Sequence, residues 1–131
     1  MENIFKTKVY YKDTDAGGVV YHARYLEWLE IGRTELIADL GFSLAKLKED
    51  KNLIFAVKKI ICEYLSPALY GAEVIIKSRI IESTGATLTF EQEIINGQDQ
   101  TPLVKAQVLL VAIDAKELRP RKIPPELKLA A

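Results

Sequence analysis

Residues 11–33 read YKDTDAGGVVYHARYLEWLEIGR, and the change of pattern within this stretch decides the fold. Before it, residues 5–12 alternate apolar or aromatic side chains with mostly basic ones, which is typical of a strand. Paired glycines and clustered Asp and Thr then interrupt the alternation over residues 13–18, as in a turn. Apolar residues next recur at helical spacing, which predicts a long helix over 22–40.

The predicted helix carries an apolar stripe and pairs of opposite charge. Its stripe consists of Leu26, Leu29, Leu36 and Leu40. Two i,i+3 pairs are expected to support its exposed side: Arg24 with Glu27 and Glu30 with Arg33. Gly41 follows the stripe and predicts the end of the helix, whereas Gly32 in its interior indicates close packing against another backbone.

Downstream of this helix the pattern becomes mostly strand-like. A short second helix is predicted over 43–50, with Ser43 as its N-cap. The predicted strands, separated by short turn-like segments, are 53–65, 72–82, 87–95 and 103–113. Short connections favour antiparallel pairing, and one face of the sheet is expected to pack on the long helix. We therefore predict an α+β fold in a single domain spanning residues 1–131.

Composition excludes several classes of function. The chain has 18 basic and 18 acidic residues, so no net charge attracts nucleic acid or an anionic membrane. One Cys and one His cannot form a disulfide or the usual zinc sites, and no metal site is predicted. No apolar run is long enough for a membrane span and the start lacks an apolar leader segment, so we expect no membrane insertion and a cytoplasmic location.

The turn and the helix start together could perform chemistry. Asp15 precedes His22 by seven residues, and Gly17-Gly18 between them allow the chain to fold back. Backbone N–H groups at a helix start lack intrahelical acceptors and can bind an oxyanion. Asp13 and Asp15 could instead be turn formers that bond nearby N–H groups, which is the role we favour for Asp13.

Residues 11–22 form the run Tyr-x-Asp-Thr-Asp-Ala-Gly-Gly-Val-Val-Tyr-His, and this run leads directly into the long helix. It resembles the signature of the YbgC/4-hydroxybenzoyl-CoA thioesterase family. The resemblance implies a hotdog fold, in which a five-stranded antiparallel sheet wraps around one long central helix. It also implies acyl-CoA thioester hydrolysis, active sites at a dimer interface, and a homo-oligomer built as a dimer of dimers.

Matched residue by residue, the resemblance places the catalytic carboxylate on Asp15, as nucleophile or general base, and the oxyanion-binding backbone N–H on His22. The candidate substrate-binding residues are Gly17, Gly18, Val19, Tyr21, Tyr25, Lys58, Lys59 and Arg121, the last three for the phosphates of coenzyme A. Coenzyme A enters only as part of the substrate, and no separate cofactor is implied. The turn at 83–86 has no basic residue where some members of the family place arginines.

Other interpretations fit the same residues. A non-catalytic acyl-thioester-binding or interaction module, with an acyl-carrier or envelope-complex partner, would keep the fold without the chemistry. A hydratase of the same fold would need a His with an acidic partner, but the only His lies in the thioesterase-like motif. Tyr25 and Trp28 could serve in packing or at an interface, and Cys62 is expected to be a buried, inert thiol.

Overall fold

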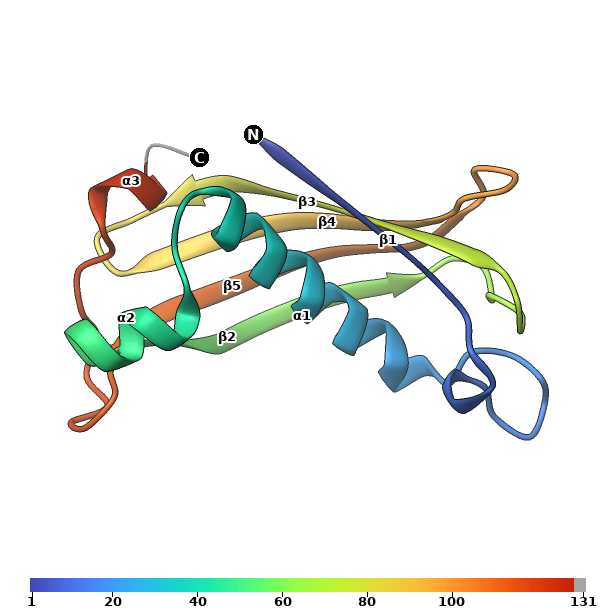
Figure 1. The fold of residues 1–131 in the computed structure, drawn as a ribbon, viewed down its shortest axis with the longest axis horizontal. Helices are drawn as coiled ribbons and strands as arrows, with labels where there is room; N and C mark the ends of the chain where they lie inside the picture. Colours follow the sequence, from blue (N-terminus) through green and yellow to red (C-terminus); the bar gives the residue numbers. More distant parts are fainter. Residues whose placement is uncertain (129–131) are drawn as a thin grey trace.

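The computed structural model describes residues 1–128, so the last three residues of the predicted domain lie outside the described part. A five-stranded antiparallel sheet carries one long helix across one face, which confirms the predicted α+β architecture (Figure 1). In chain order the elements are β1 (Glu2–Lys8), a 3-10 turn (Tyr11–Asp13), α1 (His22–Asp39), α2 (Leu44–Lys51), β2 (Leu53–Tyr64), β3 (Glu73–Ser83), β4 (Thr87–Asn96), β5 (Pro102–Asp114) and α3 (Pro125–Lys128).

The strands are ordered β1-β3-β4-β5-β2 across the sheet. Short turns connect β3 to β4 and β4 to β5, whereas α1 and α2 lie between β1 and β2 and carry the chain from one edge of the sheet to the other. A register shift between Val57 and Lys59 marks a bulge in β2. Within residues 1–128, β2 pairs only with β5, so its other edge has no strand partner.

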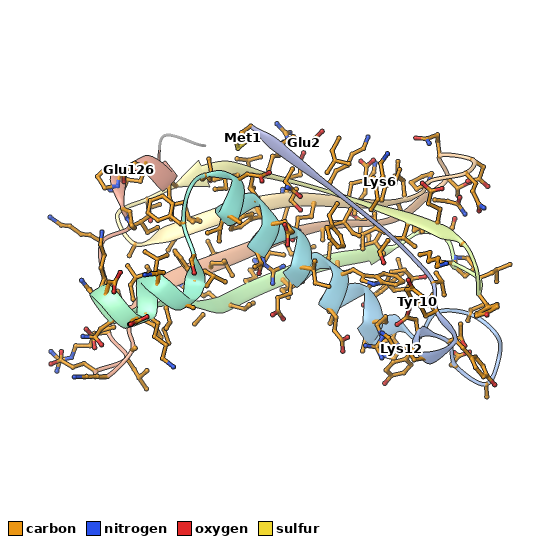
Figure 2. The ribbon with its side chains drawn as sticks, in the orientation of Figure 1. Met1, Glu2, Lys6, Tyr10, Lys12 and Glu126 are labelled. Carbon is orange, nitrogen blue, oxygen red and sulfur yellow. The ribbon has the colours of Figure 1, made fainter. Side chains whose placement is uncertain are left out.

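The first strand ends earlier than its alternation predicts. Its pairing with β3 stops at Lys8, and the predicted end at residue 12 is wrong. The Asp13 carboxylate accepts the N–H of Tyr10 at 2.9 Å, and a 3-10 turn follows at once. This local bond gives the backbone a partner other than a neighbouring strand. Tyr10 and Lys12 therefore lie in the curved segment at the end of β1 (Figure 2).

The boundaries of α1 follow from local chemistry. Gly41 has φ +91°, its N–H donates to Ala38 C=O at 2.9 Å, and the N–H of Phe42 donates to Ile37 C=O at 3.2 Å. This is a Schellman ending, which confirms the predicted role of Gly41. Ser43 caps α2 as predicted, because its hydroxyl accepts the N–H of Lys46 at 3.2 Å.

Of the two predicted charge pairs on α1, one is present. Arg24 and Glu27 form an ion pair on the surface. The pairing of Glu30 with Arg33 is wrong, because Arg33 is 6% exposed and forms no ion pair within residues 1–128. Arg33 instead donates to the Gln92 side-chain carbonyl at 3.0 Å. A helical repeat of about 3.6 residues places position 33 next to the buried stripe. The i,i+3 spacing from Glu30 therefore wrongly predicts an exposed ion pair.

Gly32 lies where α1 approaches the sheet most tightly. A Cβ at this position would be 2.5 Å from Ser78 Oγ and 2.7 Å from Ile76 Cγ2, both side-chain atoms of β3. Sequence predicts close packing here, but the neighbours are side chains rather than backbone. We expect Gly32→Ala to lower the free energy of unfolding by about 1–3 kcal/mol, because α1 must move away from the sheet. Urea titration followed by circular dichroism measures this change.

Gly85→Ala is the matched control. Gly85 lies in the turn between β3 and β4, where an added Cβ would meet no atom within 4 Å. Its substitution should leave the unfolding midpoint nearly unchanged or raise it slightly. An equal loss of stability in both variants would show that the packing under α1 is not the cause.

No helix within residues 1–128 has both the length and the apolar composition required to cross a membrane.

The sequence pattern does not predict the short helix α3. Its Leu127 is fully buried and joins Leu36, Ile37 and Phe90 in one of the two core clusters.

Candidate active site

The loop between β1 and α1 holds Asp15 in a tight turn. The Asp15 side chain accepts the N–H of Gly17 at 2.7 Å, and its backbone C=O accepts the N–H of Gly18 at 3.1 Å. The Asp15 N–H donates to Val19 C=O at 2.8 Å, which closes the turn. Gly18 has φ +80°, a conformation that suits glycine. Asp15 is exposed, and no other hydrogen bond to its carboxylate occurs within residues 1–128.

Asp13 differs from Asp15 in its surroundings. It is 1% exposed, and besides the Tyr10 N–H its carboxylate meets Lys12 Nζ at 2.9 Å and Arg24 Nε at 3.3 Å. The contact with Arg24 joins the loop to the first turn of α1. These contacts agree with the structural role expected for Asp13.

The start of α1 leaves backbone donors free. Tyr21 is the N-cap and its side chain makes no capping bond. Within the described chain, the N–H of His22 has no acceptor. Unpaired N–H groups at a helix start carry partial positive charge. This end of α1 can therefore donate to a carbonyl oxygen that acquires negative charge.

A hollow of about 270 Å³ opens beside this helix start. It is lined by Val20, His22, Tyr25, Tyr64, Leu65, Ser66 and Pro67. The Tyr64 hydroxyl donates to the C=O of His22 at 3.3 Å, and the Tyr64 ring lies 5.7 Å from the Tyr25 ring in an edge-to-face arrangement. Tyr64 is a candidate that sequence reasoning missed, because only the folded chain brings the end of β2 to the start of α1.

Tyr25 forms a wall of this hollow from the inside. It is 4% exposed, and its hydroxyl accepts the N–H of Ala68 at 3.0 Å. Burial raises the pKa of Tyr25, so the hydroxyl stays neutral at physiological pH. Its ring also packs edge-to-face on Trp28 at 5.5 Å, which supports the packing role considered for both.

Ala68, in the segment after β2, contacts both halves of the candidate site. Its N–H donates to the Tyr25 hydroxyl, and its C=O accepts the N–H of Val20 at 3.0 Å. Ala68 itself is 1% exposed. The turn that contains Asp15 and the first turns of α1 are thus fixed to one buried residue.

The single chain does not bring the Asp15 carboxylate into contact with the His22 N–H. Asp15 lines a second hollow, open and of about 490 Å³, together with Tyr11, Lys12, Thr14 and Ala16. His22 lines the hollow beside Tyr64 instead. Gly17, Gly18 and Val19 lie in the turn between the two hollows, and Tyr21 is exposed with its ring 4.5 Å from the His22 ring.

The three basic candidates for phosphate binding lie elsewhere. Lys58 and Lys59 are exposed at the bulge in the middle of β2. The Arg121 guanidinium donates to the C=O of Lys51 and lies 3.9 Å from the Asp114 carboxylate. The segment that follows β5, which contains Arg121, lies at the end of the sheet opposite to the loop between β1 and α1 (Figure 1). Within one chain these three residues therefore do not gather around the helix start.

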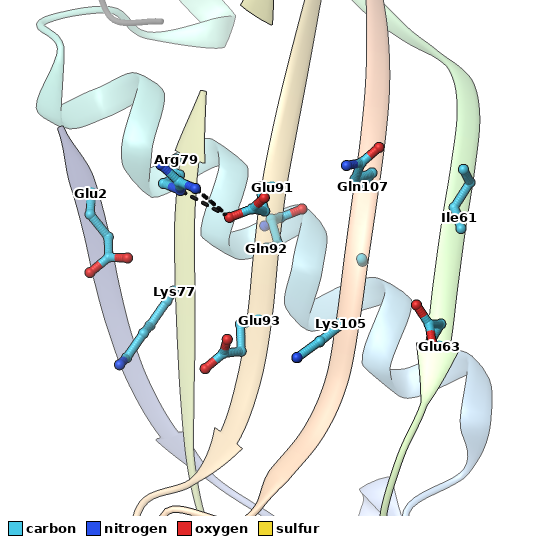
Figure 3. Close-up of a pocket in the computed structure, with 11 residues that line it drawn as sticks. Glu2, Ile61, Glu63, Lys77, Arg79, Glu91, Gln92, Glu93, Lys105 and Gln107 are labelled. Atoms are coloured by element: carbon cyan, nitrogen blue, oxygen red, sulfur yellow. Dashed lines mark hydrogen bonds and ion pairs between the residues drawn. The ribbon is translucent and has the colours of Figure 1, made fainter. Parts of the chain in front are cut away.

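Another hollow, of about 520 Å³, lies on the sheet face opposite α1 (Figure 3). Its charges alternate along two rows of cross-strand neighbours. These rows are Glu2–Arg79–Glu91 and Lys77–Glu93–Lys105–Glu63. Arg79 Nη2 lies 2.6 Å from Glu91 Oε1. Complementary cross-strand pairs stabilise a solvated sheet face, and we assign this hollow that role rather than a catalytic one.

The remaining reactive groups offer little chemistry. Cys62 is half-buried against the core, and burial raises the pKa of its thiol, which disfavours the nucleophilic thiolate. In the part of the chain that the structure describes, no three His, Cys, Asp or Glu side chains converge as metal ligands.

The five-stranded antiparallel sheet packed on one long helix agrees with a thioesterase-like protein, and residues 9–130 match the thioesterase-like superfamily. The chain is 39% identical over 126 residues to the acyl-CoA thioesterase YbgC of Haemophilus influenzae, covering 96% of this chain and 91% of that one. It is 40% identical over 117 residues to the acyl-CoA thioester hydrolase YbgC of Escherichia coli O157:H7, covering 89% and 86%. The chain therefore belongs to the thioesterase-like superfamily and, within it, to the YbgC acyl-CoA thioesterases.

Solved structures agree with the fold. The crystal structure of a probable thioesterase from Bartonella henselae aligns with a TM-score of 0.88 at 38% identity, covering 95% of this chain and all of the other. A 1,4-dihydroxy-2-naphthoyl-CoA thioesterase from Synechocystis aligns with a TM-score of 0.91 at 20% identity, covering 99% and 95%. The predicted hotdog fold is confirmed.

Proposed function

We propose that this chain hydrolyses acyl-CoA thioesters to a free acid and coenzyme A, with Asp15 and the His22 N–H as the catalytic groups. One observation carries the proposal: a carboxylate turn directly precedes a helix start whose N–H lacks an acceptor within the described chain. Its relatives are named for acyl-CoA thioester hydrolysis. The proposed negative group and the proposed oxyanion donor lie seven residues apart in the sequence.

The catalytic step requires both groups to act on one thioester carbonyl. The His22 N–H donates to the carbonyl oxygen and stabilises the negative charge that develops there. The Asp15 carboxylate either attacks the carbonyl carbon, forming a mixed anhydride that water then hydrolyses, or removes a proton from an attacking water. In both routes the C–S bond breaks and coenzyme A leaves as a thiolate. The Tyr64 hydroxyl positions the first turn of α1 through the His22 carbonyl.

A second copy of the chain would complete this site. The unpaired edge of β2 carries exposed Val57, Ile60 and Ile61, and such an edge favours pairing with another strand. Two-fold symmetry would reverse the second strand and place its start beside the end of the first. Arg121, fixed near the start of β2 through Lys51, would then approach the helix start of the other copy. The proposed assembly is a dimer, with a dimer of dimers as the larger unit.

The test is release of thiol from short, long and aromatic acyl-CoAs, read with a thiol reagent and corrected for Cys62 by an enzyme-only sample. We expect cleavage of at least one member, with free acid identified by mass. Water added across a C=C bond with the C–S bond intact would indicate a hydratase. Binding of an acyl-CoA or acyl-carrier protein without turnover would support the non-catalytic module, with its acyl-carrier or envelope-complex partner.

Cell fractionation tests the predicted cytoplasmic location.

A further inference from the structure

Arg33 is a buried cation without a buried counter-charge. It is 6% exposed on α1, and within residues 1–128 no carboxylate lies within ion-pairing distance of its guanidinium. Its one hydrogen bond runs from Nη1 to Gln92 Oε1 at 3.0 Å. A guanidinium has five N–H donors and stays charged in proteins. Within the described chain, most of its donors therefore have no hydrogen-bond partner, and no carboxylate pairs directly with its charge, although Glu30 acts on it from the same hollow.

Gln92 holds this guanidinium but cannot neutralise it. The Gln92 amide nitrogen donates to Leu29 C=O at 2.8 Å and to Ser78 Oγ at 2.8 Å, while its carbonyl accepts from Arg33. Every polar group of this side chain is thus engaged, which fixes its orientation. Burial lowers the pKa of Arg33, while the charge of Glu30 opposes this change. The contact with Gln92 thus fixes Arg33, and its remaining N–H groups, none of which is among the fully buried unpartnered atoms, stay open to a further acceptor.

Arg33 lines a hollow of about 290 Å³ with mostly apolar walls. Its lining residues are Glu30, Arg33, Thr34 and Ile37 of α1, Leu44 of α2, Phe55 and Val57 of β2, and Leu110 of β5. Glu30 is exposed, so the cation rather than the carboxylate is the buried charge. Apolar walls with one fixed cation suit a hydrocarbon chain that carries a carboxylate.

The hollow lies in line with the candidate catalytic centre. Arg33 follows His22 by eleven residues, about three helical turns, so both occupy nearly the same side of α1 about 16 Å apart. The hollow at His22 includes Tyr64 at the end of β2, and the hollow at Arg33 includes Phe55 and Val57 near its start. Ile60, exposed between them on β2, continues the apolar lining. One extended ligand could therefore lie along α1 and reach both hollows.

We propose that Arg33 binds a distal carboxylate on the acyl chain, so that medium-length dicarboxylic acyl thioesters are the preferred substrates. The preferred hydrolysis of such substrates rests on the proposed thioesterase function, whereas the binding of a carboxylate by Arg33 does not. The long side chain of a helical residue points back toward the helix start, which shortens the acyl chain required. The carboxylate would supply the direct ion-pair partner that Arg33 lacks within residues 1–128.

The first test compares α,ω-dicarboxylyl-CoAs of increasing length with monocarboxylyl-CoAs of equal carbon number. Hydrogen bonds between charged groups are worth about 10–100-fold in affinity. At the fitting length, wild type should prefer the diacid by about tenfold or more in kcat/KM, and Arg33→Met should lose this preference. Arg33→Lys keeps the positive charge but loses the planar set of guanidinium donors, so it should retain part of the preference for the diacid. Arg79→Met, on the outer sheet face, is the matched control and should keep the preference.

The second test needs no turnover. Calorimetry with free sebacate should show binding to wild type and to Arg79→Met but not to Arg33→Met, whose fold is checked by circular dichroism. If no acyl-CoA is cleaved, the proposed function fails, and Arg33-dependent sebacate binding still supports the carboxylate site. The inference would be overturned if wild type showed equal kcat/KM for diacid and monoacid thioesters of every length and also did not bind sebacate. A third outcome would also overturn the inference: Arg33→Met dissociates an oligomer but changes neither the diacid preference nor sebacate binding. The carboxylate that pairs with Arg33 would then belong to a second copy of the chain.

Discussion

Asp15→Asn is expected to reduce kcat for acyl-CoA hydrolysis by about 10²–10⁴-fold, the contribution typical of a positioned catalytic carboxylate. Asparagine keeps a side-chain oxygen that can still accept the N–H of Gly17, so the turn should retain its shape. The substitution therefore removes the charge and basicity of the side chain while preserving its position. Steady-state thiol release with the best acyl-CoA of the panel measures the effect.

Asp50→Asn serves as the control, because Asp50 is an exposed carboxylate on α2. It should leave kcat unchanged. Binding of a non-hydrolysable acyl-CoA thioether should persist in Asp15→Asn, because the variant loses chemistry rather than the pocket. If Asp15→Asn kept wild-type kcat, Asp15 would be a turn former and the proposed mechanism would be wrong.

His22→Pro should remove the oxyanion donor without breaking α1. His22 is the first residue of the helix, where proline is well tolerated because its missing N–H has no intrahelical acceptor. Tyr21 before it has φ −63° and ψ 132°, which are values that a residue preceding proline adopts readily. We expect kcat to fall by about 10²–10³-fold, the loss typical for one oxyanion-hole donor.

His22→Ala separates the backbone from the side chain. Alanine keeps the N–H and removes the imidazole, so its kcat should fall far less than that of His22→Pro. Circular dichroism should show the same helix content in both variants. Equal losses in both would mean that the imidazole, and not the backbone donor, carries the effect.

The periodicity of the sequence predicts α1 and the later strands because burial follows it closely. Leu29 and Leu36 of the predicted stripe are buried, and Gly41 ends the helix as expected. The end of β1 is missed because a single side-chain bond, from Tyr10 N–H to Asp13, redirects the backbone. Such a bond leaves no trace in an alternating pattern.

The family motif predicts Asp15 and His22 as candidates, and both assignments stay predictions. Sequence does not predict Tyr64 beside the helix start, because this contact joins residues 42 apart. Nor does it predict the burial of Arg33, which a pairing rule for exposed helix faces assigns to the surface. Both depend on how α1 crosses the sheet, and no local pattern contains that information.

Because the N–H and the C=O of Ala68 are bonded to opposite halves of the candidate site, one peptide segment sets the spacing between them. Inserting a residue just before Ala68 would shift the Asp15 turn and Tyr25 together rather than one against the other. Substitutions that aim to widen the hollow beside the helix start are therefore better placed at lining side chains that do not bond to Ala68. The segment after β2 therefore determines how far the turn that contains Asp15 lies from Tyr25, which forms a wall of the hollow.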